Sequence, residues 1–256
     1  MIHATAIVSA AAKVADDVQV GPYSIIGDGV EIGKGTRIDS HVVINGPTII
    51  GEDNHVYQFA SIGDDPQDKK YADEPTRLVI GDRNTIREFC TFSRGTAQGD
   101  YETTMGDENW IMAYVHVAHD CHIGNKTIMA NNTTLAGHVH VGDWVIMGGF
   151  SGAHQLCRIG AHAFIGMYAG INRDVPAYTM VSGMPGVPRG INSEGLKRRD
   201  FDAQQIRNIK DAYRVIYRRG LKLEDAIQEL EQRFASQPEL GILLESLRAS
   251  ERGIVR

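Results

Sequence analysis

The sequence predicts a mainly β protein with an α-helical C-terminal domain, in which the β part is a parallel β-helix of hexapeptide repeats. An apolar residue recurs every six residues over most of the chain, glycine often follows it, and the apolar spacing becomes helical only near the C-terminus. Steps of six from Ile2 meet only Ile or Val, at Val8, Val14, Val20, Ile26, Ile32, Ile38, Ile44, Ile50, Val56 and Ile62. The phase returns at Ile80, Ile86 and Phe92, and the repeat then continues one residue out of phase from Met105 to Ile171.

Each six-residue unit predicts one short strand whose apolar side chain points into a prism. Three units make one coil of about 18 residues, and successive coils pair as parallel strands about 4.8 Å apart. Stacking buries the Ile and Val ladder, and each coil contacts only its neighbours. We therefore expect a β-helix domain at residues 1–187.

Two polar stretches interrupt the repeat and are expected to leave the prism as loops. They are "DDPQDKKYADEPTR" at 64–77 and "RGTAQGDYETT" at 94–104. Loops held on a rigid scaffold often carry function. Both are therefore candidates to line a site.

Residues 188–256 are predicted to form the helical domain. In its first helix the apolar residues share one face and Gly220 ends the helix; these residues are Ile206, Ile209, Tyr213, Ile216 and Tyr217. Two more helices are expected, at 223–234 and at 240–247.

Composition limits the protein class. Hydrophobic residues make up 42% of the 256 residues, no apolar run reaches the roughly 18 residues of a spanning helix, and the N-terminus lacks the basic region of a signal peptide. Cys90, Cys121 and Cys157 are scattered singly, which favours a reducing cytoplasm. We expect a cytoplasmic protein without stable membrane insertion and without a nucleic-acid partner. Basic residues gather within 197–219, either as a site for an acidic partner or phosphate or as a solvated helix face.

A group of histidines is the strongest functional signal. With 18-residue coils, His119, His138 and His154 fall on one edge of the prism in three adjacent coils, and Gly137 and Gln155 share the column of His119. His116 lies on the strand that precedes His119. A second polar column is expected to be a solvated ladder: His122, His140 and Arg158. The same solvated role is expected for His3, His41, His55 and His162.

Three interpretations compete for the histidine edge. Neutral imidazoles bind zinc well, as in the trimeric γ-class carbonic anhydrases, although the His-x4-His pair of that class is missing here. Alternatively, His119 takes a proton from a sugar hydroxyl that attacks a thioester, Asp120 orients the imidazole, and the N–H of Gly137 binds the oxyanion. The third interpretation is a purely structural repeat, against which the number of imidazoles on one edge argues.

Six stretches of the chain together resemble the UDP-N-acetylglucosamine O-acyltransferases of lipid A biosynthesis, in order and spacing. They are "YQFASIG" (57–63), "DEPTR" (73–77), "HVAHDC" (116–121), "ANNTTLAGHV" (130–139), "AHQLC" (153–157) and "EGLKRR" (194–199). The resemblance implies a homotrimer of left-handed parallel β-helices with sites in clefts between neighbouring prisms. It implies transfer of a 3-hydroxyacyl group from acyl carrier protein to the 3-hydroxyl of UDP-N-acetylglucosamine. The sequence itself does not distinguish a 3-hydroxyl from a 3-amino group on the acceptor. The resemblance implies neither a cofactor nor a metal.

The resemblance also assigns residues. His119 would be the general base with Asp120 beside it, and Gly137 the oxyanion donor. The substrate-binding residues would be Asp68, Lys70, His116, His138, His154, Gln155, Asn192, Glu194, Arg198 and Arg199. Acyl carrier protein would dock on basic residues among Lys197, Arg214, Arg218 and Arg219.

Met167 takes the position that limits acyl-chain length in this family, where Gly admits a longer chain and Met blocks it. The resemblance therefore implies a preference for 3-hydroxydecanoyl over 3-hydroxymyristoyl. Three positions depart from the family pattern: Ser93 in "SRGT" for "HRGT", Met184 in "GMPG" for "GNPA", and Asp200 in "RRDF" for "RRGF". None of them touches the proposed base.

Overall fold

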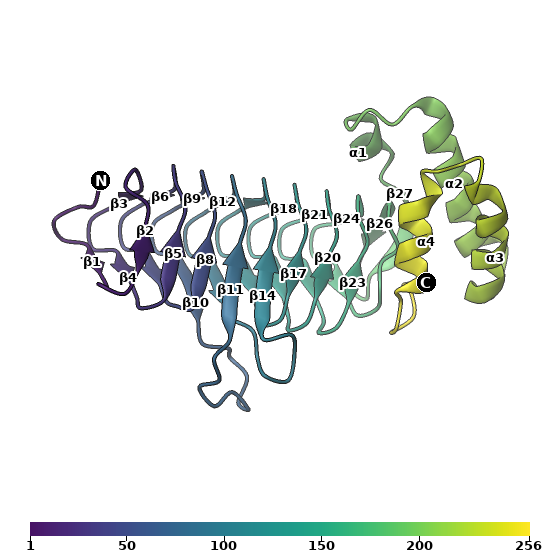
Figure 1. The fold of residues 1–256 in the computed structure, drawn as a ribbon. Helices are drawn as coiled ribbons and strands as arrows, with labels where there is room; N and C mark the ends of the chain where they lie inside the picture. Colours follow the sequence, from purple (N-terminus) through teal and green to yellow (C-terminus); the bar gives the residue numbers. More distant parts are fainter.

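The computed structural model describes residues 1–256 as an elongated prism of stacked coils that carries a group of helices at its C-terminal end (Figure 1). Three parallel sheets form the walls of the prism, and each coil contributes one strand to each wall. We call these walls sheets I, II and III in the order in which the chain enters them. The three edges of the prism are accordingly the I–II, II–III and III–I edges.

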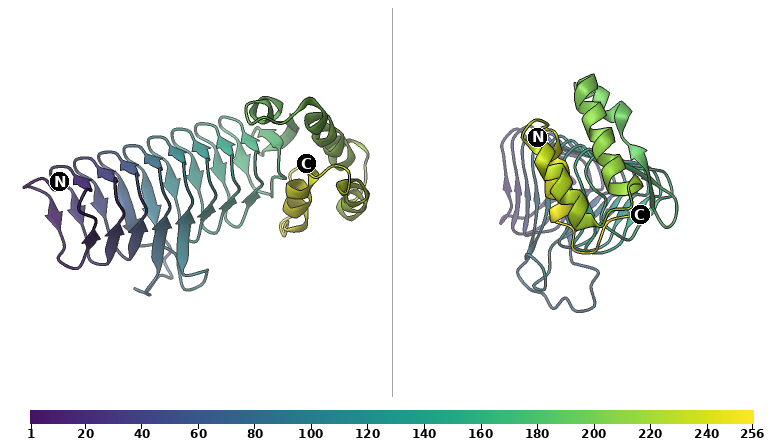
Figure 2. Two further views of the ribbon diagram at one scale, coloured as in Figure 1. Left: turned by 45° about the horizontal axis from the view of Figure 1, so that its top comes forward. Right: turned by 90° about the vertical axis from the view of Figure 1, so that its right-hand side faces the viewer.

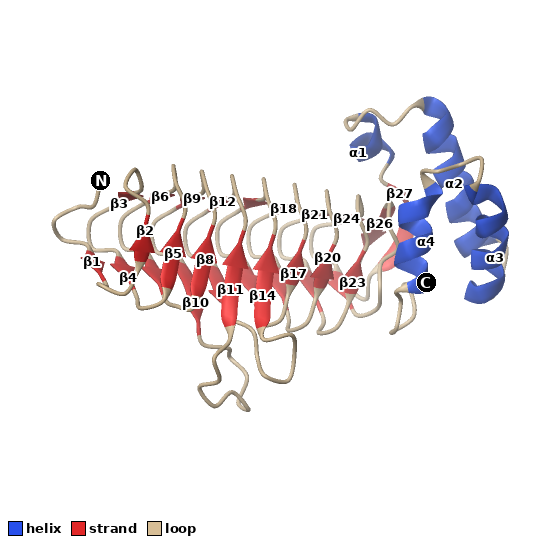
Figure 3. Ribbon diagram, in the orientation of Figure 1, coloured by secondary structure: helices blue, strands red, loops and turns tan.

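The strands are short and the turns at the edges are tight (Figure 3). Sheet I contains β1 (Ile7–Val8), β4 (Ile25–Ile26), β7 (Val43–Ile44), β10 (Ser61–Asp64), β13 (Thr91–Ser93), β16 (His116–Val117), β19 (Thr134–Leu135), β22 (Gly152–Ala153) and β25 (Gly170–Ile171). Sheet II contains β2 (Lys13–Val14), β5 (Val30–Ile32), β8 (Thr48–Ile50), β11 (Arg77–Ile80), β14 (Glu102–Met105), β17 (His122–Ile123), β20 (His140–Val141) and β23 (Arg158–Ile159). Sheet III contains β3 (Gln19–Val20), β6 (Arg37–Ile38), β9 (His55–Val56), β12 (Thr85–Ile86), β15 (Trp110–Ile111), β18 (Ile128–Met129), β21 (Ile146–Met147), β24 (Phe164–Ile165), β26 (Thr179–Ser182) and β27 (Val187–Ile191).

The six-residue repeat builds the interior of the prism. Its apolar residues pair in register from coil to coil, for example Ile44 with Ile62 and Ile62 with Phe92. From Val20 to Ile171 they belong to one core cluster of 39 buried residues, whereas Val8 and Val14 only pack against it and Ile2 is exposed. Burial of one such side chain contributes about 1.5–3 kcal/mol, so the ladder is the main stabilising element of the prism.

Two loops leave the prism at the I–II edge, where both protrude from its lower side in Figure 1. The first loop is residues 65–76, one residue shorter at each end than predicted. The second loop is residues 94–101, three residues shorter than predicted at its C-terminal end. Residues 102–104 were expected in the second loop, and this expectation is wrong. They form β14 instead, because Thr103 pairs with Leu78 in the neighbouring coil.

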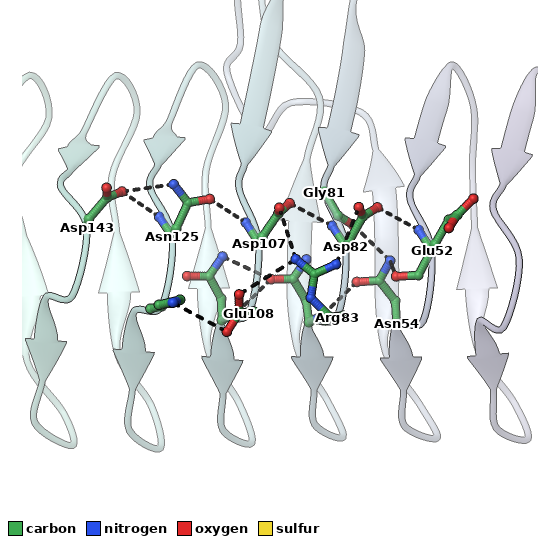
Figure 4. A network of polar contacts seen from close by, with 12 residues as sticks. Glu52, Asn54, Gly81, Asp82, Arg83, Asp107, Glu108, Asn125 and Asp143 are labelled. Carbon is green, nitrogen blue, oxygen red and sulfur yellow. Dashed lines mark hydrogen bonds and ion pairs between the residues drawn. The ribbon is translucent and has the colours of Figure 1, made fainter.

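A ladder of polar side chains runs along the II–III edge (Figure 4). A carboxylate or amide oxygen in one coil accepts the backbone N–H of the coil before it: Asp82 from Glu52, Asp107 from Asp82, Asn125 from Asp107 and Asp143 from Asn125, at 2.7–2.9 Å. Inside the same edge, buried amides form a second ladder of the opposite direction, with Asn54 accepting from the N–H of Asn84 and Asn84 accepting from the N–H of Asn109 in the following coils. Buried N–H groups at the turns are thereby satisfied.

The C-terminal helices lie at the end of the prism (Figure 2). They are α1 (Ser193–Lys197), α2 (Ala203–Arg218), α3 (Leu223–Phe234) and α4 (Leu240–Arg248), and they share a second core of 14 buried residues. Asp202 begins α2 with a capping box to Gln205. Gly220 follows α2 with a φ of 68° and ends the helix, as the sequence predicts. The predicted boundary between residues 187 and 188 falls inside β27, which pairs antiparallel with β26. None of the helices has the length and apolarity required to cross a membrane.

Candidate functional site

The I–II edge brings together segments that are far apart in the sequence. Each of them follows a strand of sheet I and precedes a strand of sheet II: the first loop, the second loop, residues 118–121, residues 136–139 and residues 154–157. The topology therefore stacks His119, Gly137–His138 and His154–Gln155 in three consecutive coils, as the sequence predicts.

His119 and Asp120 form a hydrogen-bonded pair at this edge. The distance from Nδ1 of His119 to Oδ2 of Asp120 is 2.7 Å. Asp120 is 1% exposed, whereas the His119 side chain is 15% exposed and reaches solvent. Burial acts to raise the pKa of Asp120, but hydrogen bonds from His119 and Thr96 outweigh burial and hold that pKa below its usual range. A carboxylate beside Nδ1 favours the tautomer with its proton on Nδ1, which leaves Nε2 of His119 as a base.

Gly137 packs directly against the imidazole of His119. A Cβ on Gly137 would lie 2.5 Å from Cε1 and 2.8 Å from Nε2 of His119, so only glycine leaves room for the ring. The backbone N–H of Gly137 donates to no acceptor within the protein, while its C=O accepts from Leu156 N. The N–H next to the imidazole is therefore free to donate to a ligand oxygen.

Two further histidines adjoin the pair. The rings of His119 and His138 meet edge to face with centroids 5.1 Å apart, and Nε2 of His138 lies 3.8 Å from Oδ2 of Asp120. His116, on β16, is half-buried, and the distance from its Nδ1 to Oγ1 of Thr91 is 2.7 Å. Burial, with a smaller effect of His119, lowers the pKa of His116. His116 is therefore a neutral hydrogen-bonding group at neutral pH.

His154 and Gln155 lie at the same edge but are exposed, and His154 lines a different hollow from His138. The His154 hollow measures about 690 Å³ and extends over sheet I beside Thr134 and Phe150. His138 lines a smaller hollow of about 280 Å³ on the side of sheet II, together with Asp120 and Leu156. The edge thus offers one polar hollow next to the His119–Asp120 pair and one longer groove over sheet I.

The first loop places Asp68 and Lys70 at the I–II edge, where Oδ1 of Asp68 accepts the N–H of Lys70. Arg94, at the start of the second loop and 7% exposed, holds the first loop in place. Its guanidinium donates to the C=O of Gly63 at 2.7 Å and to the hydroxyl of Tyr71 at 2.9 Å, and it pairs with Asp65. Arg94 therefore fixes the position of the first loop relative to the second loop.

Asn192, Glu194, Arg198 and Arg199 lie at the II–III edge, not at the I–II edge. Asn192 caps α1 and donates to the C=O of His162, and Nη1 of Arg199 lies 3.0 Å from Nδ1 of His162. One chain therefore does not bring these four residues to His119. They would meet His119 only across a contact between two copies of the prism.

The expected solvated role of His162 is wrong. His162 is 7% exposed and packs between Trp144, Tyr178 and Phe201. Burial, and secondarily the charge of Arg199, lowers the pKa of His162 to about 4. This histidine is a neutral acceptor that positions Arg199, and Arg199 in turn lies over the ring of Trp144 at 4.9 Å.

Met167 lies at the III–I edge, between β24 and β25, and is 58% exposed. Its Cε lies over Gly149 of the preceding coil, 4.0 Å from where a Cβ of that glycine would be. The neighbouring Phe150 and Tyr168 stack with centroids 5.3 Å apart. Met167 thus adds an apolar obstacle on the outer surface beside the end of sheet I.

The second histidine column forms in the predicted register, with His122 opposite His140 and His140 opposite Arg158. It is not freely solvated, however. His122 bridges Thr104 and Asp100, and burial followed by the charge of Arg158 lowers the pKa of His140 to about 4. The column is therefore a half-buried structural array on sheet II.

The pair and His138 also have the composition of a metal site. Ligand atoms of His119, Asp120 and His138 all lie within 4.8 Å of one another. Both oxygens of Asp120, however, already accept hydrogen bonds from Thr96, and Oδ2 is shared with His119. The carboxylate is thus arranged as a hydrogen-bond acceptor for its neighbours, which favours the base interpretation.

Sequence reasoning missed Thr96 and the polar ladder. Thr96 stands in a polar loop where no spacing distinguishes it from its neighbours. The ladder has a readable signal, because Gly-acid-x-Asn recurs at the II–III edge as "GEDN" (51–54), "GDRN" (81–84) and "GDEN" (106–109). A side chain on the glycine of this motif would collide with the carboxylate of the next coil, as at Gly51 and Asp82.

Comparison with protein families gives two matches. The family described as "Udp N-acetylglucosamine O-acyltransferase; Domain 2" matches residues 174–255. The family described as "Bacterial transferase hexapeptide (six repeats)" matches residues 11–46 and 102–137. The two matches cover parts of the prism and the helical end of the chain.

Full-length relatives carry one name, acyl-[acyl-carrier-protein]–UDP-N-acetylglucosamine O-acyltransferase. The protein of Stutzerimonas stutzeri is 55% identical over 256 residues, which is 100% of this chain and 99% of that protein. The protein of Stenotrophomonas maltophilia is 56% identical over 256 residues, 100% of this chain and 97% of that protein.

Solved structures agree with the sequence matches. LpxA from Acinetobacter baumannii superposes with a TM-score of 0.98 at 48% identity, over 100% of this chain and 99% of that one. LpxA from Moraxella catarrhalis, a UDP-N-acetylglucosamine O-acyltransferase, gives a TM-score of 0.99 at 45% identity over the same shares. The fold is thus the left-handed parallel β-helix of hexapeptide repeats, and the predicted fold class is confirmed.

Proposed function

The chain belongs to the UDP-N-acetylglucosamine O-acyltransferase family, and from this we propose that it moves a 3-hydroxyacyl group from acyl carrier protein to the glucosamine 3-hydroxyl of UDP-N-acetylglucosamine. It is an O-acyltransferase of lipid A biosynthesis, for which this transfer is the first step. The observation that supports the mechanism is the 2.7 Å contact between Nδ1 of His119 and the buried carboxylate of Asp120.

The chemistry follows from this contact. Nε2 of His119 removes the proton of the sugar hydroxyl while that oxygen attacks the thioester carbonyl carbon, forming a new C–O bond. Negative charge develops on the carbonyl oxygen, which accepts a hydrogen bond from the free N–H of Gly137. Asp120 stabilises the imidazolium that forms at His119. When the tetrahedral intermediate collapses, the C–S bond breaks and the departing thiolate takes the proton from His119.

Substrate binding draws on two edges of the prism. We assign Asp68, Lys70, His116, His138, His154 and Gln155 at the I–II edge to one side of the substrates, and Asn192, Glu194, Arg198 and Arg199 of a neighbouring protomer to the other. The distance between these edges on one chain supports a site between protomers, and thus a homotrimer. A planar guanidinium suits a phosphate oxygen pair, which gives Arg198 and Arg199 a role at the diphosphate.

The acyl donor enters as a thioester on the phosphopantetheine of acyl carrier protein, so no further cofactor and no metal is required. An acidic carrier protein complements the exposed basic residues of α2, where Arg218 and Arg219 lie near the end of the helix. Met167 would limit the acyl chain and favour 3-hydroxydecanoyl. Its bulk and exposure beside sheet I support this assignment.

The test is His119→Ala in the full-length protein, assayed with acyl carrier protein thioester and UDP-N-acetylglucosamine. We expect O-acylation to fall by about a hundredfold to ten-thousandfold, the usual contribution of a general base. The variant should keep its oligomeric state by size-exclusion chromatography. Acylation at the wild-type rate would exclude His119 as the base.

A zinc enzyme of the γ-carbonic-anhydrase type is a second candidate, because His119, Asp120 and His138 offer ligand atoms close together. That function predicts stoichiometric zinc in the purified protein and loss of activity with a chelator. Our proposal predicts acyl transfer that is unchanged after chelation, and metal analysis of the same sample separates the two.

A further inference from the structure

We propose that Thr96 is a positioning residue for the acyl transfer. Its hydroxyl and its backbone N–H hold the carboxylate of Asp120 in the orientation that His119 requires. The inference rests on the function proposed above, because it concerns the residue that orients the base. It adds the second loop, residues 94–101, to the functional elements of the protein.

Thr96 binds both oxygens of the carboxylate. Its backbone N–H donates to Oδ1 of Asp120 at 2.9 Å, and its Oγ1 donates to Oδ2 at 2.7 Å. Oδ2 is the same oxygen that contacts Nδ1 of His119. Two anchors on two different oxygens fix the rotation of the carboxylate, whereas His119 alone would leave it free to turn.

No solvent can take over this role, because Thr96 is 0% exposed and Asp120 is 1% exposed. A buried carboxylate without its donors loses strong charge-assisted hydrogen bonds. With the Thr96 hydroxyl removed, Oδ1 keeps the Thr96 N–H, but Oδ2 keeps only its contact with His119, so the oxygen that orients the imidazole loses its second partner. The structure therefore couples the geometry of the base to a hydroxyl that does not touch the substrate.

The second loop is built to deliver Thr96. The C=O of Thr96 accepts the N–H of Gly99 and the N–H of Tyr101, both at 3.2 Å, which closes the loop around this residue. Gly99 lies so close to Asp120 that a side chain at this position would collide with the carboxylate. The backbone of Asp120 is also held, because its N–H donates to Oγ1 of Thr103 at 2.8 Å.

The chain contains a matched control at the II–III edge. Thr127 donates through its N–H and its Oγ1 to Oδ1 of Asn109, both at 2.7 Å. Thr127 is also 0% exposed, and Asn109 is 1% exposed. The two donor groups and the burial match those of Thr96 and Asp120, but both donors bind one oxygen, and the acceptor is a neutral amide that no histidine contacts.

The experiment compares Thr96→Val, Thr96→Ser and Thr127→Val in the full-length protein by steady-state kinetics with acyl carrier protein thioester and UDP-N-acetylglucosamine. Valine keeps the shape and the backbone N–H of threonine and removes only the hydroxyl. We expect Thr96→Val to lower kcat by about tenfold to a hundredfold, the range of a lost hydrogen bond to a charged group, with KM for the sugar nucleotide within about twofold. Thr96→Ser should restore most of kcat, and Thr127→Val should lower only the melting temperature.

The proposal is overturned if Thr96→Val keeps the wild-type kcat, if Thr96→Ser is as impaired as Thr96→Val, or if Thr127→Val loses kcat to the same degree. If Thr96→Val does not fold, Thr96→Ala serves in its place, because it also removes the hydroxyl and keeps the backbone N–H, and it should lower kcat equally. His119→Ala distinguishes a failure of the proposed base from a failure of the proposed role of Thr96. An active His119→Ala ends the proposed base, whereas an inactive His119→Ala with a fully active Thr96→Val ends only the role of Thr96.

Discussion

Nη1 of Arg199 lies 3.0 Å from Nδ1 of His162, at an edge of the prism that His119 does not share. The contact links the segment after α1 to the prism, and the guanidinium lies over the ring of Trp144. Arg199 is therefore held rigidly and faces away from the His119 of its own chain. A site that uses both residues must take them from two protomers.

Mixed trimers test this arrangement. His119→Ala and Arg199→Met should each abolish most activity as homotrimers, because every site then lacks one of the two groups. Co-expressed in equal amounts, they should recover about a quarter of the wild-type activity, since in a cyclic trimer a quarter of the sites pair an intact His119 with an intact Arg199. That quarter refers to the whole co-expressed population. Differently tagged chains and a tandem purification isolate the mixed trimers, each of which has one intact site in three and should show about a third of the wild-type activity. Mixed trimers with no activity would show that both residues act within one chain.

Gly137→Ala should inactivate the enzyme without unfolding it. The new Cβ would lie 2.5 Å from Cε1 of His119, so the imidazole must shift away from the nucleophile. A displacement of about 1 Å from the productive geometry can cost on the order of a hundredfold in rate. We expect kcat to fall by that order and the melting temperature to change by only a few degrees. Wild-type kcat in this variant would contradict the packing of Gly137 on His119.

Met167→Gly should relax the limit on acyl-chain length. Each methylene that gains burial contributes about 0.8 kcal/mol, so the variant should accept 3-hydroxymyristoyl better than the wild-type protein does. A competition assay with 3-hydroxydecanoyl and 3-hydroxymyristoyl carrier proteins measures the ratio of kcat/KM directly. Equal ratios in the wild-type protein and the variant would remove Met167 from the acyl site.

Acid should destabilise the protein through His140 and His162. Burial, followed by the charges of Arg158 and Arg199 respectively, lowers the pKa of each to about 4. The unfolded chain binds these two protons near pH 6.5 and the folded chain does not, so this stability is fully present above about pH 6.5 and is lost as the pH falls toward about 4. The loss is up to about 3 kcal/mol for each histidine.

Melting temperatures at pH 7, 6 and 5 check this expectation. The wild-type value should fall across the series, and the fall should be smaller in His140→Gln and in His162→Gln. The lowered pKa of Asp120 acts only below its usual value of about 3.9 and does not interfere in this window. A melting temperature that stays constant from pH 7 to pH 5 would contradict the neutral state of both imidazoles.

The repeat was predictable because a buried position in a β-helix accepts only a narrow set of side chains. Ile44 and Ile62 have neighbours of the same kind in the coils above and below, so six-residue spacing is enough to place them. The edge that carries His119 follows from the same count. The helices at 203–218 and 223–234 were equally readable, because their apolar faces keep the 3.6-residue period.

What the sequence did not reveal depends on contacts between segments of irregular structure. Thr96 reaches Asp120 because the second loop folds back on the next coil, and no periodicity describes that path. Residues 187–191 form β27 because β26 offers a free edge, although the sequence predicted a domain boundary between residues 187 and 188. His162 became buried only because Tyr178 and Phe201 cover it.

The ladder at the II–III edge has a consequence for how this architecture can change in length. Asp107 and Asn125 each cap a neighbouring turn, so an extra residue there would break the caps on two successive coils. At the I–II edge no such chain of caps exists, and both excursions of this chain, at 65–76 and 94–101, occur there. Insertions that change substrate choice can therefore occur at the I–II edge, while the ladder at the II–III edge keeps the spacing of the coils constant.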